Sequence, residues 1–173
     1  EKDGDIDLIA GNWGRNTRYQ SLMHGEEGLR LYTADGNQDG ILETIEAWFD
    51  ESNGHWWPID GLGHQEKVFL GLRAHYPTHH ALAGVPMHAL AETLDLDKAF
   101  LHVNTLDSMV FLNQGGRFQS LPLPEVAQRS PVRDMVGADF NLDGYGDLFV
   151  AQNWESTPDH IGRLDAGQGL ILQ

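Results

Sequence analysis

Two nine-residue segments place oxygen-bearing side chains at the same alternating positions, and this spacing constrains the fold more than any other feature. Positions 1, 3, 5 and 9 are occupied by Asp35, Asn37, Asp39 and Glu43 in one segment and by Asp139, Asn141, Asp143 and Asp147 in the other. Glycine stands at position 6 of both, where it permits a tight backbone turn that a side chain would hinder. The pattern therefore predicts two tight loops whose alternate side chains turn inward together.

The first residues of the chain fit the last seven positions of a third copy. Asp3 falls at position 5 and Asp7 at position 9, while position 1 is missing. In every copy the backbone carbonyl of position 7 is a further candidate ligand, from Asp5, Ile41 or Tyr145. The truncated copy is expected to bind a metal less well than the two complete ones.

Calcium is the cation that these loops favour. Hard cations of this kind take six to eight oxygen ligands at about 2.3–2.6 Å. Without a cation, the clustered carboxylates repel one another. Ordinary turn chemistry also places Asp, Asn and Gly together, but three copies on one spacing favour a metal site. Ca²⁺ is therefore the predicted cofactor.

The segments flanking the loops distinguish between two types of calcium-binding loop, one between helices and one between strands. Residues 35–46 match the EF-hand pattern, whereas the second loop has Val150 where an EF-hand requires Glu. EF-hand loops lie between helices. Residues 29–33 and 44–49 alternate like strands, and residues 148–151 form an apolar run typical of a buried strand. We therefore expect strand, loop, strand, with an EF-hand-like sensor as the alternative.

The sequence after the loops repeats as well. Residues 7–13 parallel residues 147–154 with one insertion. Asp7 and Glu43 are separated by about the length of one propeller blade. This self-similarity predicts stacked units, and both ends of the chain are expected to continue in a longer protein.

The loops and the apolar runs after them resemble the FG-GAP or VCBS repeats, whose blades build integrin-alpha-like β-propellers. Within that group the chain is most similar to ASPIC/UnbV-type relatives. The segments that carry the resemblance are 3–10, 35–43 and 139–151, together with 12–19, 103–106 and 111–118. The resemblance implies a mainly β fold, a partial β-propeller of antiparallel four-stranded blades over residues 1–173. It also implies calcium in the loops and a place outside the cell or in the cell envelope.

Residues 63–97 interrupt the strand pattern and are expected to form a small helical insertion within a blade. Apolar residues recur at helical spacing over 65–73 and again over 85–96. The insertion carries five histidines: His64, His75, His79, His80 and His88. A metal-dependent enzyme using these histidines is an alternative reading, but Pro77 lies between His75 and His79, so we expect that the rings do not converge on one metal.

Composition narrows the remaining choices. The formal net charge of -15 disfavours nucleic acid as a partner, and no apolar run is long enough to span a membrane. Familiar nucleophile and phosphate-binding motifs do not occur in the sequence. We expect a non-enzymatic recognition or adhesion protein that binds a protein or carbohydrate through its blade loops and joins further blades.

The neighbouring Trp56 and Trp57 allow two interpretations. They form either an exposed aromatic platform for a ligand or a strand with one indole packed inward. The second is favoured because aromatic residues are common in strands.

Overall fold

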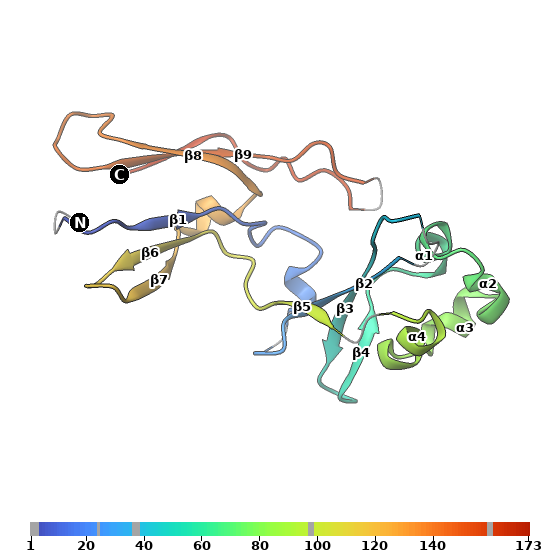
Figure 1. Cartoon of the computed structure of the whole chain (residues 1–173). Coiled ribbons are helices and arrows are strands. Elements are labelled where there is room, and N and C mark those ends of the chain that lie inside the picture. Colours follow the sequence, from blue (N-terminus) through green and yellow to red (C-terminus); the bar gives the residue numbers. More distant parts are fainter. Residues whose placement is uncertain (1–3, 24, 36–38, 97–98, 159–160) are drawn as a thin grey trace. The chain divides into compact units, whose positions relative to one another are not determined.

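The computed structural model describes residues 4–23, 25–35, 39–96, 99–158 and 161–173. The chain divides into two compact units (Figure 1). One comprises residues 1–20 and 106–173, and the other comprises residues 21–105. Each is described by itself. None of the described helices has the length and apolar character needed to cross a membrane.

The first unit contains two three-stranded antiparallel sheets (Figure 1). The strands are β1 (Leu8–Ala10), β6 (Met109–Asn113), β7 (Phe118–Pro122), β8 (Val132–Ala138), β9 (Asp147–Gln152) and β10 (Leu170–Leu172). The sheet orders are β1-β6-β7 and β10-β9-β8. Side chains from both sheets share one core, in which Leu148 and Val150 of β9 are buried and Val110 of β6 packs against them.

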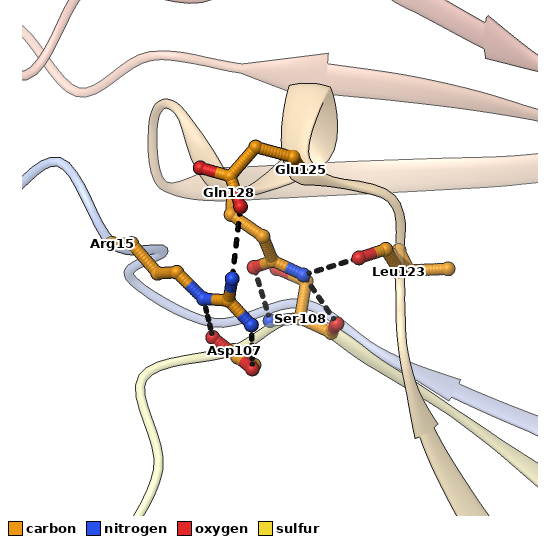
Figure 2. Close-up of polar contacts among 6 residues, drawn as sticks. All are labelled: Arg15, Asp107, Ser108, Leu123, Glu125 and Gln128. Carbon is orange, nitrogen blue, oxygen red and sulfur yellow. Dashed lines mark hydrogen bonds and ion pairs between the residues drawn. The ribbon is translucent and has the colours of Figure 1, made fainter.

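A polar network holds the connections of this unit in place (Figure 2). Gln128, at the end of the 3₁₀ helix η2 (Glu125–Gln128), is buried and donates to the backbone carbonyls of Ser108 and Leu123 at 2.9 Å each. Its side-chain oxygen accepts from the Ser108 N–H at 2.8 Å. Buried polar groups are costly unless paired, and here every amide atom of Gln128 has a partner.

Arg15 forms a second part of the network (Figure 2). Its guanidinium donates twice to Asp107, at 2.7 Å each, and once to Glu125 at 2.8 Å. The hydrogen bond to Asp107 raises the pKa of Arg15. This fork ties the segment after β1 to residues about one hundred positions later in the sequence.

The second unit is a four-stranded antiparallel sheet with four short helices (Figure 1). Its strands are β2 (Leu29–Ala34), β3 (Glu43–Asp50), β4 (His55–Pro58) and β5 (Phe100–Val103), in the order β4-β3-β2-β5. The helices α1 (Leu62–Val68), α2 (Leu72–His75), α3 (His79–Ala83) and α4 (Met87–Thr93) connect β4 to β5. The 3₁₀ turn η1 (Gln20–Leu22) spans the point in the sequence where the first unit ends and the second begins.

One face of this sheet forms the core with the helices. Ile45 and Ala47 of β3 alternate with polar residues and are buried against the helical leucines. The buried apolar residues of the helices are Leu62, Leu72, Leu82, Met87 and Leu90. Each helix is too short to be stable alone, so this apolar face provides most of its stability.

The predicted insertion is helical, but its helices differ from the expected ranges. The helix expected over 65–73 is two helices, α1 and α2, because Gly71 adopts a left-handed conformation with φ of 89° between them. The helix expected over 85–96 begins only after Pro86, whose extended backbone serves as the N-cap of α4. Pro77 separates α2 from α3, as its missing N–H predicts.

The mainly β, antiparallel character of the chain is confirmed, whereas four-stranded blades are observed only in part. Only one of the three sheets among the described residues has four strands, and these sheets do not close into a barrel or propeller. The described residues between β9 and β10 contribute a single isolated bridge, Trp154 to Leu164, instead of a further strand. Side-chain hydrogen bonds, such as the one from Asn153 to the Gly167 carbonyl, replace a strand ladder there.

Candidate functional site

Both complete oxygen-rich loops connect neighbouring antiparallel strands. The first joins β2 to β3, and Glu43 at its end pairs with Ala34. The second joins β8 to β9, and Asp147 at its end pairs with Ala138. The strand, loop, strand prediction is therefore confirmed, and the helices that an EF-hand requires do not flank either loop.

The loop of residues 139–147 is organised by its own side chains. The two carboxylate oxygens of Asp139 accept from the N–H groups of Asp143, at 3.1 Å, and Gly144, at 2.8 Å. The Asp143 carboxylate accepts from the Tyr145 N–H at 2.8 Å. Asn141 contacts Asp143 twice, accepting from its N–H at 3.0 Å and donating to its carboxylate at 2.9 Å.

The loop that begins at Asp35 repeats this arrangement. Asp35 accepts from the N–H groups of Asp39 and Gly40, at 3.0 Å each. Asp39 accepts from the Ile41 N–H at 2.8 Å. Gly40 and Gly144 have φ angles of 86° and 85°, a conformation that residues with a side chain rarely adopt. The described parts of the two loops thus share these hydrogen bonds and the left-handed glycine as well as one sequence pattern.

The ninth position closes the loop from its other side. Asp147 is only 3% exposed, and its Oδ2 accepts from the Phe140 N–H at 2.9 Å. Glu43 occupies the equivalent position at the start of β3 and is half-buried. Both positions are held by a strand ladder, so their side chains enter the loop from a rigid element.

The loop residues fit a hard cation in the chemistry of their donors. All the candidate side chains offer carboxylate or amide oxygens, which calcium prefers. A carboxylate has about four lone-pair sites, so one backbone hydrogen bond to an oxygen leaves it able to bind a cation. Within the described ranges, however, no three His, Asp or Glu side chains are positioned together to hold a metal.

For several predicted ligands the structure gives no position or no test of their role. Asn37 and Asp3 lie outside the described residues. Ile41 and Tyr145 are described, and their N–H groups are bound by the carboxylates at position 5. The role of their carbonyl groups stays a prediction.

Acidic residues of the incomplete copy at residues 3–7 form long-range hydrogen bonds that the sequence did not indicate. Asp7 accepts from the Asn113 N–H at 2.8 Å, and Asp5 accepts from the Gly115 N–H at 3.2 Å. Both contacts lie at the turn between β6 and β7, more than one hundred residues away in the sequence. Gly4 nevertheless shares the left-handed conformation of the other two loops, with φ of 89°.

The five histidines of the insertion are distributed over all four helices α1 to α4, with His64 in α1. His75 ends α2, His79 and His80 begin α3, and His88 lies in α4. The ring of His88 has His55 of β4 as a neighbour, with ring centroids 6.0 Å apart. Arg73 binds Glu66 and lowers the pKa of that carboxyl, which links α1 to α2.

The two neighbouring tryptophans face different surroundings, as the strand interpretation predicted. Trp56 packs against the core of the second unit, and the Arg30 guanidinium lies 3.8 Å from its ring centroid. Trp57 points its indole N–H toward Asn53 Oδ1 at 3.4 Å. Only Trp57 therefore remains a candidate for ligand contact.

Comparisons of the chain with protein-family models, with curated proteins and with solved structures found no match.

Proposed function

We propose that this chain is a calcium-stabilised recognition or adhesion module of FG-GAP/VCBS type, without enzymatic activity. In this proposal it belongs to an extracellular or envelope-facing protein, and further blades complete its propeller. Calcium stiffens the loops between strands, and exposed loops and the helical insertion meet a protein or carbohydrate partner.

The observation that supports this proposal most is the shared geometry of the two complete loops. In each, the carboxylate at position 1 accepts from the N–H groups at positions 5 and 6, and the carboxylate at position 5 accepts from position 7. These hydrogen bonds order two carboxylates within each short loop, and a divalent cation bound there would relieve the repulsion between them. Asp147, buried and fixed at the end of the second loop, adds a charge that needs compensation.

Calcium is expected to raise the melting temperature of the chain. A ligand that binds only the folded state stabilises it by about 2.7 kcal/mol at a hundredfold excess over its Kd. Differential scanning calorimetry with a chelator, and then with millimolar calcium, measures the change. Magnesium at the same concentration is the control, because it demands a smaller octahedral site. An unchanged melting temperature in all conditions would contradict the calcium proposal.

In each complete loop, the carboxylate at position 5 is expected to account for that loop's share of the calcium-induced rise in melting temperature. Asp143→Asn keeps an oxygen that accepts from the Tyr145 N–H but removes the charge, so it should leave the calcium-free melting temperature nearly unchanged. It should abolish the part of the calcium-induced rise that belongs to the second loop. Asp39→Asn should do the same for the first loop, since Asp39 binds the Ile41 N–H in the same way.

Asp3→Asn provides the matched comparison. Its loop lacks position 1, so the substitution should change the calcium-induced rise least. Isothermal titration calorimetry counts the bound ions for each variant. Equal losses for all three variants would show that the incomplete loop binds calcium as well as the complete ones.

A further inference from the structure

A cavity of about 460 Å³ opens beside β4, within the unit of residues 21–105. Part of its lining is apolar, with the half-buried side chains of Trp48, Trp57 and Ile59. Asp50 and Asp60 also line it. The cavity therefore combines an apolar surface with carboxylates, and none of the described loop residues lines it.

The two indoles are placed by the sheet. Trp48 of β3 and Trp57 of β4 are directly opposite each other in the strand register, so their side chains leave the same face as neighbours. The hydrogen bond from the Trp57 indole to Asn53 ties that ring to the turn between the two strands. Asn53 is held in the same turn, because its side-chain oxygen also accepts from the His55 N–H at 3.0 Å.

The same turn keeps a negative charge in position. Asp50 Oδ1 accepts from both the N–H and the hydroxyl of Ser52, at 3.0 and 2.6 Å, and its Oδ2 accepts from Asn53 at 2.8 Å. Hydrogen bonds of this kind favour the ionised form of a carboxyl group. The carboxylate and the Trp57 indole are thus arranged before any ligand arrives.

The charge of the cavity has one sign. Asp60 contributes a second carboxylate, and its side chain is 18% exposed. No lysine or arginine lies among the residues that line the cavity. Two histidines are close to it: His79 in the lining, and His64, whose Nε2 is 3.8 Å from the Asp60 carboxylate. The lining thus carries two carboxylates and, apart from histidine, no basic side chain.

We propose that this cavity binds the side chain of an arginine or lysine residue presented by a partner protein. The aliphatic part of such a side chain packs against the two indoles, and its cation interacts with the indole faces and the two carboxylates. The chain's net charge of -15 also attracts a basic partner from a distance. A neutral saccharide would use the indoles, but it offers no positive charge to the two carboxylates.

This inference rests on the proposed recognition role but not on calcium. The cavity contains none of the loop residues proposed as metal ligands. A failure of the calcium experiments would leave it standing, and a failure here would leave the calcium proposal standing.

The test is titration of the intact chain with the peptide acetyl-Gly-Arg-Gly-amide. Binding is followed by NMR through the indole N–H signals of Trp48 and Trp57. For one anchoring side chain we expect a Kd on the order of 1 mM, equivalent to about 4 kcal/mol of binding free energy. The same peptide with neutral citrulline in place of arginine should bind at least about tenfold more weakly, a difference of about 1.4 kcal/mol.

Three variants make the test specific to this cavity. Asp60→Asn should weaken binding about tenfold, and Trp57→Phe should weaken it while preserving strand packing. Glu51→Gln is the matched control. It removes one negative charge from the turn between β3 and β4, at an exposed residue that does not line the cavity. It should leave the affinity nearly unchanged. Melting temperatures confirm that each variant is folded.

Several results would overturn the proposal. One is equal affinity for the arginine and citrulline peptides, and another is equal weakening by Asp60→Asn and Glu51→Gln, which would indicate non-specific attraction to an acidic protein. Indole signals that shift with chitotriose or cellotriose but not with the peptide would assign the cavity to saccharides. No shift with about 10 mM peptide, well above the expected Kd, would also contradict it.

Discussion

Replacing Gly28 by alanine should destabilise the second unit by about 2–5 kcal/mol, from about 1–2 kcal/mol of backbone strain and about 1–3 kcal/mol of overpacking. Gly28 has a φ of 61°, and a Cβ placed on it would lie 2.1 Å from the backbone oxygen of Val103. Since that oxygen belongs to the backbone of β5, it moves only if the pairing of β2 with β5 shifts.

Two other glycines of the same unit separate the two contributions. Gly71 has a φ of 89° with nothing within 4 Å of an added Cβ, so Gly71→Ala should show the strain alone. Gly84 has a φ of -93° and the same open space, so Gly84→Ala should be neutral or slightly stabilising. Urea unfolding monitored by tryptophan fluorescence measures all three. Equal effects at Gly28 and Gly71 would show that the contact with Val103 is not tight.

Replacing Gln128 by leucine should destabilise the first unit by about 2–5 kcal/mol. The change leaves the N–H of Ser108 and the carbonyl of Leu123 without this partner in a buried place, at about 1–3 kcal/mol for each unsatisfied group, while the Ser108 carbonyl keeps its hydrogen bond from the Leu123 N–H. Relaxation of the surrounding chain keeps the total below a simple sum. Hydrogen exchange should show the loss of protection in β6 and β7, which flank these groups.

Gln119→Leu is the matched control, because it makes the same chemical change on an exposed residue of β7. Its side-chain oxygen accepts only an exposed hydrogen bond from Gln114. The change should stay within about 0.5 kcal/mol of the wild-type free energy of unfolding. A comparable loss for both variants would mean that the Gln128 network is not what holds the first unit together.

The features that could be predicted from the sequence are those whose causes lie within a few residues. The loops at 35–43 and 139–147 are organised by Asp and Asn side chains and by glycine N–H groups no more than seven residues from their partners. Pro77 separates α2 from α3 for an equally local reason, a missing N–H. By contrast, the break between α1 and α2 was missed, because apolar spacing continues through the left-handed Gly71.

The strand content of the sheets could not be predicted in the same way. β1 pairs with β6, and β5 reaches back to β2 across the whole helical insertion. The expectation of four-stranded blades did not specify which strands would pair with one another. Among the described residues between β9 and β10, side-chain hydrogen bonds take the place of a strand ladder. Such hydrogen bonds leave no periodic signal in the sequence.

The positions of the tight loops, the strands that flank them and the oxygens they carry follow from local sequence, because the hydrogen bonds that shape each loop form within one turn of chain. The hydrogen bond from the Asn113 N–H to Asp7, the burial of Gln128 beside Ser108 and the cavity beside Trp57 arise only in the folded chain. Each of these depends on groups 20 or more residues apart. Their approach is driven by burial of apolar surface, which acts without regard to distance along the chain.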